Sequence, residues 1–405
     1  MTLRHDRGFD LESRLRQREQ RDLRRDLAPV DRVGARARTA PDPQGDPPAF
    51  DDEALVFAAN NYLGLASDER VAAAAAEAAS EVGTGAGASR LIVGDTPAHR
   101  SLERALADEK STERALAFSS GYAANAGTIT ALDPDVVFSD RLNHASIIDG
   151  VGLSGADVEV YDHCDPGALR EAMASQAQAS GDAGETDEGE SWLVVTDSVF
   201  SMDGTVAPLE RLCEVTEEYG AWLMVDDAHA TAVHPGGIVG ERGLADRVEV
   251  QLGTLSKALG AQGGFVAGSE PLVEHLLNAA RSFVFSTGLA PPAAAAAERA
   301  LELAPERRDQ LQANTERLRT GLETAGYEVW GESHILPVLV RDREAALALD
   351  ERLRERGIVA PAIRPPTVPE GTSRIRLAPQ ATHTEAEIDQ AVAAFEAAGE
   401  AVGLL

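Results

Sequence analysis

Two carboxylates and an imidazole follow an apolar run in the segment Leu223–His229, which reads LMVDDAH. A buried strand that leads directly into Asp226, Asp227 and His229 places polar groups where burial is costly unless they have a use. In α/β proteins, ligands bind at the carboxyl ends of parallel strands. The segment therefore indicates a site in which a carboxylate and an imidazole act on a ligand, although a lone DD pair also occurs at solvated strand ends.

One lysine follows another apolar strand, in the segment Gly253–Gly260 (GTLSKALG). Small neighbours let a ligand approach the Lys257 amine closely, and burial there would lower the pKa of the amine, as imine-forming lysines require. Of the 37 basic residues in the chain only two are lysines, Lys110 and Lys257. We interpret Lys257 as a functional amine, and we predict that Lys110, which lies among carboxylates in DEKSTE, is a solvated surface residue.

A turn that opens into a helix is predicted at Phe118–Asn125 (FSSGYAAN). Free amides and the helix dipole make such an N-terminus a phosphate site, although Ser and Gly are also ordinary helix caps. Together, the three segments predict a phosphorylated cofactor that forms an imine with Lys257 and has a ring nitrogen facing Asp226. Pyridoxal 5′-phosphate (PLP) meets all three demands, and Asp226 would keep its ring nitrogen protonated.

The elements that carry these segments alternate along the chain. From Phe50 onward, short apolar runs are separated by helical stretches, which is typical of a parallel sheet covered on both faces. The runs that predict strands are 136–138, 192–195, 222–225 and 250–252. We predict an α/β fold with three parts: a helical segment and linker at 1–49, a large cofactor-binding domain at 50–290, and a smaller α+β domain at 291–405. Within the first part, residues 1–40 are predicted to form one charged helix.

The motifs resemble, in order and over nearly the whole chain, those of the α-oxoamine synthases. These are PLP-dependent enzymes of fold type I that condense a small amino acid with an acyl-CoA. The motif at 196–204 (TDSVFSMDG) is the most specific one. The others are NNYLGL (60–65), GTGAGASR (83–90), SGY (120–122), NHAS (143–146), DDAH (226–229), TLSK (254–257), RSFVFST (281–287) and GTSRIR (371–376).

The resemblance implies a role for each matching residue. Lys257 would bind the cofactor and later move the substrate Cα proton, while His144 would stack on the cofactor ring. Asp226 would pair with the ring nitrogen, and His229 would hydrogen-bond the ring hydroxyl. Ser201 would lie near the same ring oxygen. Gly121, Tyr122 and Thr254 would hold the phosphate, with Ser286 or Thr287 from a partner subunit. Asn60 and Arg376 would bind the amino-acid carboxylate. The family also implies a homodimer.

The acyl substrate is less determined. The segment Leu23-Arg24-Arg25 resembles a basic element that contacts the distal carboxylate of pimeloyl-CoA, but Arg24 could equally lie on a solvated helix face. The resemblance thus implies condensation of L-alanine with pimeloyl-CoA, with glycine and acetyl-CoA as the alternative. Ala230 and Ala232 stand where the family usually has glycines. A non-catalytic subunit of the same fold would be expected to have lost Lys257 or Asp226, and both are present.

Composition bounds the remaining classes of function. The 405 residues carry a net charge of −30, which disfavours duplex nucleic acid and anionic membranes as partners. No apolar run is long enough for a membrane span, and the charged start is unlike a secretory signal, so we expect a cytoplasmic protein. Cys164 and Cys213 lack metal-ligand spacing, and no metal is expected. Strong acidity with so few lysines favours adaptation to concentrated salt, although GC-rich codon usage also favours arginine over lysine.

Overall fold

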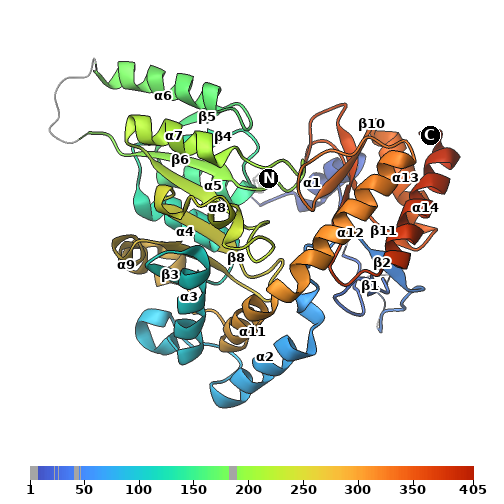
Figure 1. The fold of residues 1–405 in the computed structure, drawn as a ribbon, viewed down its shortest axis with the longest axis horizontal. Helices are drawn as coiled ribbons and strands as arrows, with labels where there is room; N and C mark the ends of the chain where they lie inside the picture. Colours follow the sequence, from blue (N-terminus) through green and yellow to red (C-terminus); the bar gives the residue numbers. More distant parts are fainter. Residues whose placement is uncertain (1–7, 22, 26, 41–44, 46, 182–188) are drawn as a thin grey trace, which may run out of the picture.

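The structure is a computed structural model that describes residues 8–21, 23–25, 27–40, 45, 47–181 and 189–405. The described residues form a large lobe around a seven-stranded sheet and a small lobe that contains the C-terminal helix (Figure 1). In spatial order, the strands of the large sheet are β3 (Arg114–Phe118), β9 (Gly264–Gly268), β8 (Val250–Thr254), β7 (Trp222–Asp226), β6 (Trp192–Asp197), β4 (Val136–Asp140) and β5 (Asp157–Tyr161). Only β9 runs antiparallel to its neighbours, so the predicted, mostly parallel sheet is confirmed.

Alternate residues of the central strands belong to two separate apolar clusters. Val137, Val195 and Met224 face one cluster, and Phe138 and Val194 face the other. The first cluster is covered by α4 (Gly121–Leu132), α5 (Ala145–Ser154), α9 (Glu270–Ala279) and α10 (Arg281–Val284), and the second by α6 (Pro166–Gly181), α7 (Leu209–Tyr219) and α8 (Gly237–Glu241). Because both faces are buried, the strands can be apolar throughout.

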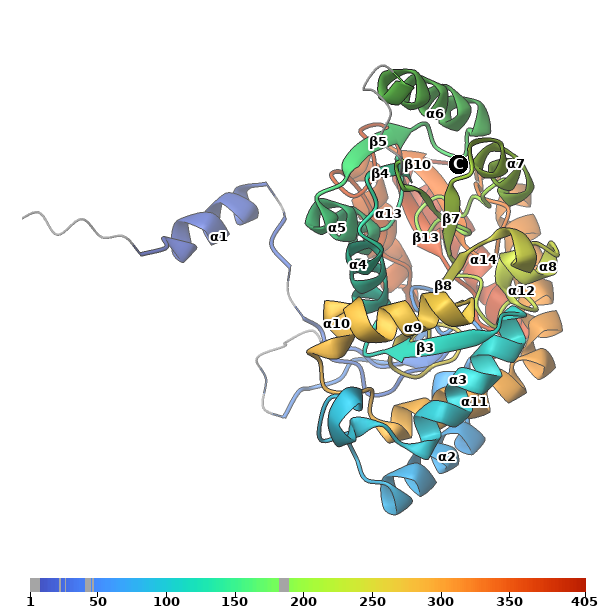
Figure 2. The same ribbon diagram turned by 90° about the vertical axis from the view of Figure 1, so that its left-hand side faces the viewer.

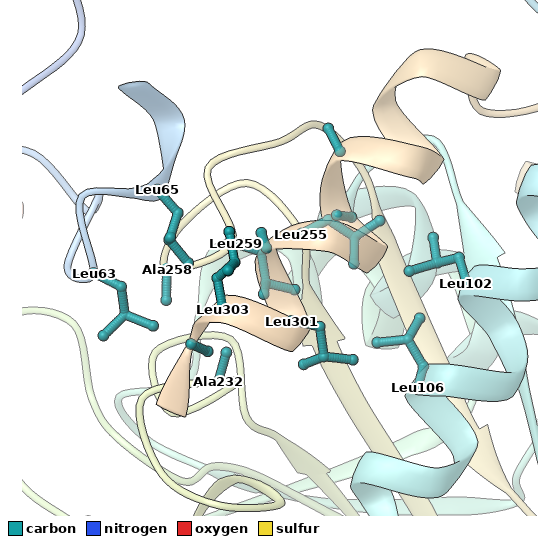
Figure 3. Close-up of a cluster of buried hydrophobic side chains, with 14 of the residues drawn as sticks. Leu63, Leu65, Leu102, Leu106, Ala232, Leu255, Ala258, Leu259, Leu301 and Leu303 are labelled. Carbon is teal, nitrogen blue, oxygen red and sulfur yellow. The ribbon is translucent and has the colours of Figure 1, made fainter. Parts of the chain in front are cut away.

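A third apolar cluster lies beside the end of β8. Leu255, Ala258 and Leu259, which flank Lys257, pack against leucines of three other segments (Figure 3). These segments are the turn with η1 (Leu65–Ser67), α3 (Pro97–Lys110) and α11 (Pro291–Leu303), and α11 also packs on α2 (Glu69–Glu81). Each fully buried leucine contributes about 2 kcal/mol to stability. The turn that carries Lys257 is therefore held on a rigid base.

The small lobe is built on two short sheets. One has the antiparallel strands β10 (Leu336–Arg341), β13 (Ser373–Leu377) and β12 (Ala362–Ile363). The other has β1 (Arg36–Ala37), β2 (Ala54–Val56) and β11 (Ile358–Val359). Helices α12 (Pro305–Thr324), α13 (Arg343–Arg354) and α14 (Glu385–Val402) pack with these strands around one core. An antiparallel sheet with helices is the α+β arrangement predicted for this part of the chain.

The lobes do not follow the predicted domain limits residue by residue. Helix α11 packs in the core of the large lobe, and β2 pairs with β1 and β11 of the small lobe. We therefore propose that the small lobe begins near Pro305 and also includes the described residues between 36 and 57. The limits at 49/50 and 290/291 stay a prediction.

The single helix predicted over residues 1–40 is wrong in extent. Helix α1 spans Leu11–Gln20, and the described residues from 23 to 40 contain a short strand and no helix. Leu11 and Leu15 are exposed, so α1 buries no apolar face that would extend it, and it projects away from the body (Figure 2). Farther along, Asp31 accepts a hydrogen bond from the Arg38 amide, which closes a turn in place of a helix. Residues 1–7, 22 and 26, and most of the predicted linker (41–44 and 46), lie outside the described residues.

No helix in the described part of the chain combines the length and the apolar character that a bilayer span requires.

Candidate active site

Strands β6, β7 and β8 are neighbours in the large sheet, and their carboxyl ends place the candidate groups side by side. Asp197 is the register partner of Asp226, and Asp226 is the partner of Leu252. The Lys257 Nζ lies 2.9 Å from the His229 Nε2. Burial lowers the pKa of Lys257 to about 8, and the charges of Asp226 and Asp197 oppose this shift. The amine is thus partly neutral near physiological pH.

A hydrogen-bonded chain runs from the amine toward the small lobe. The His229 Nδ1 lies 2.6 Å from the Tyr62 hydroxyl, which donates to the Asn60 Oδ1 at 3.0 Å. Burial and the neighbouring Lys257 charge hold the pKa of His229 well below its usual range, so the ring is neutral. Because the Tyr62 proton points to Asn60, the His229 Nδ1 donates to the Tyr62 oxygen and its Nε2 accepts from Lys257. Tyr62 had no role in the sequence interpretation, although it lies in the NNYLGL motif.

Asp226 is held in a single orientation by two donors. Its Oδ2 accepts from the Asn125 Nδ2 at 2.7 Å, and its Oδ1 accepts from the Ala228 amide at 2.9 Å. Asn125 also donates to the Ser146 Oγ at 3.0 Å, and that hydroxyl lies 2.6 Å from the His144 Nδ1. This role of Asn125 was not predicted from the sequence. Its place on the buried face of the helix after FSSGY was the available signal.

A second carboxylate adjoins this group. The Asp197 Oδ2 accepts from the His144 amide at 3.1 Å. Burial and the charge of Asp226 raise the pKa of Asp197 well above its usual range. Burial lowers the pKa of His144, so its imidazole tends to be neutral at neutral pH. The structure thus places His144, Asp226, His229 and Lys257 near one another, and the roles that their motifs imply stay predictions.

The N-terminus of α4 meets the end of β8 at a close approach. A Cβ on Gly264 would lie 2.5 Å from the Gly121 backbone, and a Cβ on Gly121 would lie 3.4 Å from the Thr254 Oγ1. Thr254 Oγ1 also lies 2.8 Å from the Ser256 Oγ, a hydroxyl that sequence analysis did not single out. The α4 amides and these hydroxyls form a set of donors suited to a phosphate. Tyr122 contributes its backbone here, while its side chain is exposed and donates to Asp149.

Strand β13 brings an arginine from the small lobe to the same site. The Arg376 Nη2 donates to the Asn60 Oδ1 at 3.0 Å, and its Nε donates to the Ser201 carbonyl at 2.5 Å. Arg376 is buried, so its charge acts in a medium of low polarity. Asn60, Ser201 and Arg376 therefore lie together, and a planar guanidinium among them suits a carboxylate ligand.

Three predicted site residues lie apart from this group in the described structure. Ser286 and Thr287 follow α10, and the Ser286 Oγ donates to the Thr287 carbonyl at 3.2 Å. Arg24 pairs with Glu19 at 3.5 Å and lines a cavity of about 210 Å³ with Arg364 and the Pro365-Pro366 turn. The structure shows no hydrogen bond from Arg24, Ser286 or Thr287 to the described residues around Lys257, so their predicted roles stay predictions.

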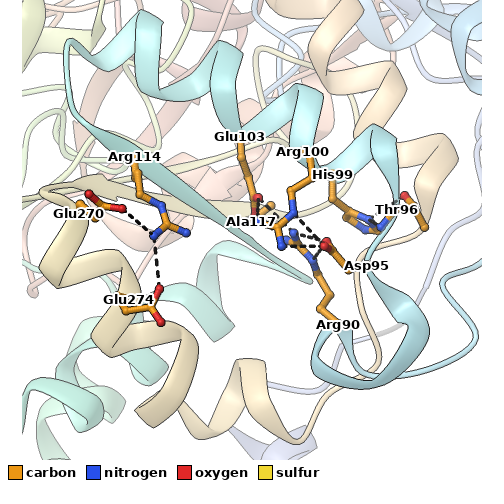
Figure 4. Close-up of polar contacts among 10 residues, drawn as sticks. All are labelled: Arg90, Asp95, Thr96, His99, Arg100, Glu103, Arg114, Ala117, Glu270 and Glu274. Atoms are coloured by element: carbon orange, nitrogen blue, oxygen red, sulfur yellow. Dashed lines mark hydrogen bonds and ion pairs between the residues drawn. The ribbon is translucent and has the colours of Figure 1, made fainter.

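A charged cluster joins the GTGAGASR motif to α3 (Figure 4). Arg90 donates to Asp95 at 2.6 Å and to Glu103, and Glu103 accepts from the Ala117 amide at 2.9 Å. The His99 Nε2 lies 2.6 Å from the Leu289 carbonyl. Arg90 therefore ties the GTGAGASR motif to α3, and His99 ties α3 to the segment that follows α10.

The prediction that Lys110 is a solvated surface residue is wrong. Its side chain is 0% exposed, and its Nζ donates to the Asp227 Oδ2 at 2.6 Å. The neighbours in sequence were misleading, because Lys110 is the last residue of α3 and its side chain points inward to Asp227. Both lysines of the chain thus lie at or beneath the candidate site.

The prediction of no metal rested on spacing along the chain. Among the described residues, Asp140, His163 and Cys164 place one possible ligand atom each within 4.8 Å of one another. The His163 Nδ1 lies 3.0 Å from Asp140, and its Nε2 lies 2.9 Å from the Thr205 Oγ1. Burial raises the pKa of the Cys164 thiol to about 12, which disfavours a thiolate ligand. Because both histidine nitrogens have protein partners, the group is explained without an ion.

The geometry can be compared with known proteins. Residues 52–395 match the family model described as aminotransferase class I and II. The chain belongs to this family. An 8-amino-7-oxononanoate synthase of Anaeromyxobacter dehalogenans is 47% identical over 386 residues, which cover 93% of this chain and 92% of the relative. Similarity at this level places the chain in the α-oxoamine synthase branch, as the motifs predicted.

Solved structures agree with this placement. A serine palmitoyltransferase of Sphingomonas wittichii aligns with a TM-score of 0.86 and 31% identity, and the match covers 98% of each chain. An 8-amino-7-oxononanoate synthase of Francisella tularensis aligns with a TM-score of 0.70 and 26% identity over 87% of this chain and 99% of the other. The predicted fold type I is therefore confirmed.

Proposed function

We propose that the protein condenses L-alanine with pimeloyl-CoA and releases 8-amino-7-oxononanoate, CoA and carbon dioxide. The observation that carries the proposal is the buried Lys257 amine, whose pKa is lowered to about 8 and which contacts a neutral His229 beside Asp226. Relatives 44–47% identical over most of the chain carry the name of this activity. The reaction belongs to biotin biosynthesis, and the predicted cytoplasmic location stays a prediction.

Pyridoxal 5′-phosphate is the cofactor of this branch, and the residues present fit it. The groups that the cofactor needs lie at one edge of the large sheet. They are an amine that can form an imine, a carboxylate held in place for the ring nitrogen, and hydrogen-bond donors at the start of α4 for the phosphate. When bound, the cofactor supplies an electron sink for negative charge that develops at the substrate Cα. Lys257, Asp226, His229, His144 and Thr254 would hold it, together with the donors at Gly121, Tyr122 and Ser201.

Lys257 is the group that would move the Cα proton. At a pKa of about 8, the amine is partly neutral and accepts a proton, and it returns the proton as an ammonium ion of moderate acidity. His229 accepts a hydrogen bond from the Lys257 Nζ, which directs the amine. Their contact holds the free amine in place.

Arg376 and Asn60 would bind the carboxylate of the amino acid. The two side chains are already in contact, so the guanidinium needs little reorganisation to receive a ligand. Because Arg376 comes from β13 of the small lobe, binding of the amino acid would also join the two lobes.

A second copy of the chain would complete the site, as the predicted homodimer requires. Ile92, Val93 and Phe285 are 75%, 77% and 74% exposed, and the Ser89 Oγ donates to the Val284 carbonyl, which ties their two segments together. Exposed apolar groups of this size typically mark an interface. Sedimentation of the purified protein should return twice the chain mass of 42.7 kDa; a single chain mass at micromolar protein would contradict the dimer.

A substrate panel tests the proposed function. Purified protein with PLP is assayed for CoA release with L-alanine, glycine or L-serine, each with pimeloyl-, acetyl- or palmitoyl-CoA. We expect alanine with pimeloyl-CoA to have the highest kcat/KM. Preference for glycine with acetyl-CoA would favour a glycine C-acetyltransferase, and preference for serine with palmitoyl-CoA would follow the fold match to serine palmitoyltransferase. Either result, or no turnover, would contradict the proposal.

The pH dependence of cofactor binding follows from the pKa of Lys257. Only the neutral amine attacks an aldehyde, so the rate of PLP binding to unloaded protein should rise about tenfold per pH unit below pH 8 and level off above it. Stopped-flow absorbance measures this rate. Nα-acetyl-lysine is the control, since its ordinary amine should keep gaining rate to about pH 10. A protein profile that follows the control would contradict the lowered pKa.

We also propose that the protein is adapted to concentrated salt. Its charge of −30 repels itself, and the Debye length falls from about 10 Å at 0.1 M salt to about 3 Å at 1 M. The melting temperature should therefore rise steeply between dilute buffer and 1 M KCl. Sucrose is the control, because it strengthens burial without screening charge. Equal gains in KCl and sucrose, or no gain in KCl, would contradict the proposal.

A further inference from the structure

One buried ammonium group joins the two ends of the loop that carries His229. The Lys110 Nζ donates to the Asp227 Oδ2 at 2.6 Å and to the Gly236 carbonyl at 3.0 Å. Asp227 opens the loop and Gly236 closes it. The same end of α3 holds Gly236 a second time, because the Glu109 Oε1 accepts from its amide at 2.9 Å.

The first turn of this loop is built on Asp227. Its carbonyl accepts from the Ala230 amide at 2.9 Å and the Thr231 amide at 2.7 Å, and its own amide donates to the Leu252 carbonyl of β8 at 2.8 Å. His229 lies within this turn, one residue before Ala230. The position of the His229 ring therefore depends on where Asp227 is held, and the side chain of Asp227 is held by Lys110.

The space around the ammonium explains why a lysine is retained there. A Cβ on Gly237 would lie 2.5 Å from the Lys110 Nζ and 2.1 Å from the Asp227 Oδ2. Both partners of the pair are 0% exposed. A compact ammonium fits this space, whereas a planar guanidinium needs more room. In a chain that uses arginine for almost every other cation, Lys110 is a position where arginine does not fit.

We propose that Lys110 and Asp227 are a positioning pair for His229 and thereby for the Lys257 amine. The inference rests on the proposed function in one respect, because kcat is measured with the proposed reaction. Lys110 touches neither Lys257 nor His229 in the described structure, so it is not a catalytic residue. It acts by fixing the loop, and its loss should displace the imidazole from the 2.9 Å contact with the Lys257 Nζ.

The test uses the small number of lysines in the chain. Full-length protein labelled with ¹³C at lysine Cε should give two lysine signals, and the K110M variant should leave only that of Lys257. Because K110M leaves the buried Asp227 charge unpaired and could fail to fold, the main variant is the double substitution K110M/D227L, in which both groups become apolar. K110R tests whether a guanidinium fits.

The expected result is a folded double variant in which the titration midpoint of Lys257 moves to lower pH by at least about half a unit. The neutral His229 nitrogen accepts a hydrogen bond from the ammonium form, and losing it favours the neutral amine. With PLP bound, kcat of the double variant should fall about tenfold or more, and the K110R variant should also have a lowered kcat. L349A, a cavity variant in the buried core of the small lobe, is the control for lowered stability and should keep both the midpoint and kcat.

Two outcomes would overturn the proposal. A folded double variant with the wild-type midpoint and kcat would show that the pair is only structural. Wild-type values of the midpoint and of kcat in the K110R variant would contradict the inference that a guanidinium does not fit. The titration needs neither cofactor nor acyl-CoA. A wild-type protein that fails in the substrate panel would therefore contradict the proposed function while leaving the test of the pair intact.

Discussion

Replacing Lys257 by alanine should abolish the imine absorbance of the PLP-loaded protein and reduce turnover by about 10²–10⁴-fold or more. This range is what loss of proton transfer costs in general, and loss of covalent attachment adds to it. The fold should persist, because the flanking Leu255, Ala258 and Leu259 still anchor the turn (Figure 3). Absorbance spectra and CoA release measure the two effects.

Labelling of the cofactor site gives a second readout for the same change. Borohydride reduction of the loaded wild-type protein should attach the cofactor to one lysine, and peptide mass spectrometry should place it at Lys257. Lys110 should stay unlabelled because it is fully buried in its ion pair. R141A removes an exposed cation paired to Asp162 and serves as the control, with unchanged spectrum and turnover. Persistent absorbance and turnover in K257A would refute the role of Lys257.

Replacing Asp226 by asparagine should lower kcat by about 10²–10³-fold, the usual effect of removing one preorganised electrostatic group. The change removes a charge and keeps the shape. Asn125 can adapt to it, because its Oδ1 is buried without a partner among the described residues. A flip of its amide would let this oxygen accept from the new side chain. Melting temperatures should therefore stay close to that of the wild type.

The same variant should also shift the titration of the amine. The charge of Asp226 raises the pKa of Lys257, so its removal should lower that pKa below about 8. The plateau in the rate of PLP binding would then begin at lower pH. D162N, which removes an exposed carboxylate, is the control and should change neither property. A D226N protein with wild-type kcat would contradict the pairing of Asp226 with the cofactor.

The lysine at the site was predictable because its surroundings are local. Lys257 follows an apolar strand directly, and its small neighbours stand beside it in the chain. Asp226 and His229 are likewise close in sequence and share one strand end. Apolar runs were sufficient to predict β4, β6, β7 and β8 for the same reason, since strands buried on both faces are apolar runs, but β3, β5 and β9 were not predicted.

Lys110 shows where this kind of reasoning failed. Its neighbours Asp108, Glu109 and Glu113 made it look solvated, yet its partner Asp227 lies 117 residues away. Which face of α3 is buried depends on the helices and strands packed against it. Asn125 and Tyr62 were missed in the same way, because their contacts come from other elements.

The chemical types at the site were thus set by residues near one another in the chain: an amine, a carboxylate, an imidazole and a phosphate-binding turn, each at the end of an apolar run. Packing between distant segments supplied the rest. It neutralised His229 by burial, lowered the pKa of Lys257, joined Arg376 of the small lobe to Asn60, and buried Lys110 against Asp227. These properties depend on desolvation and on distances across the fold, and neither quantity exists until the chain has folded.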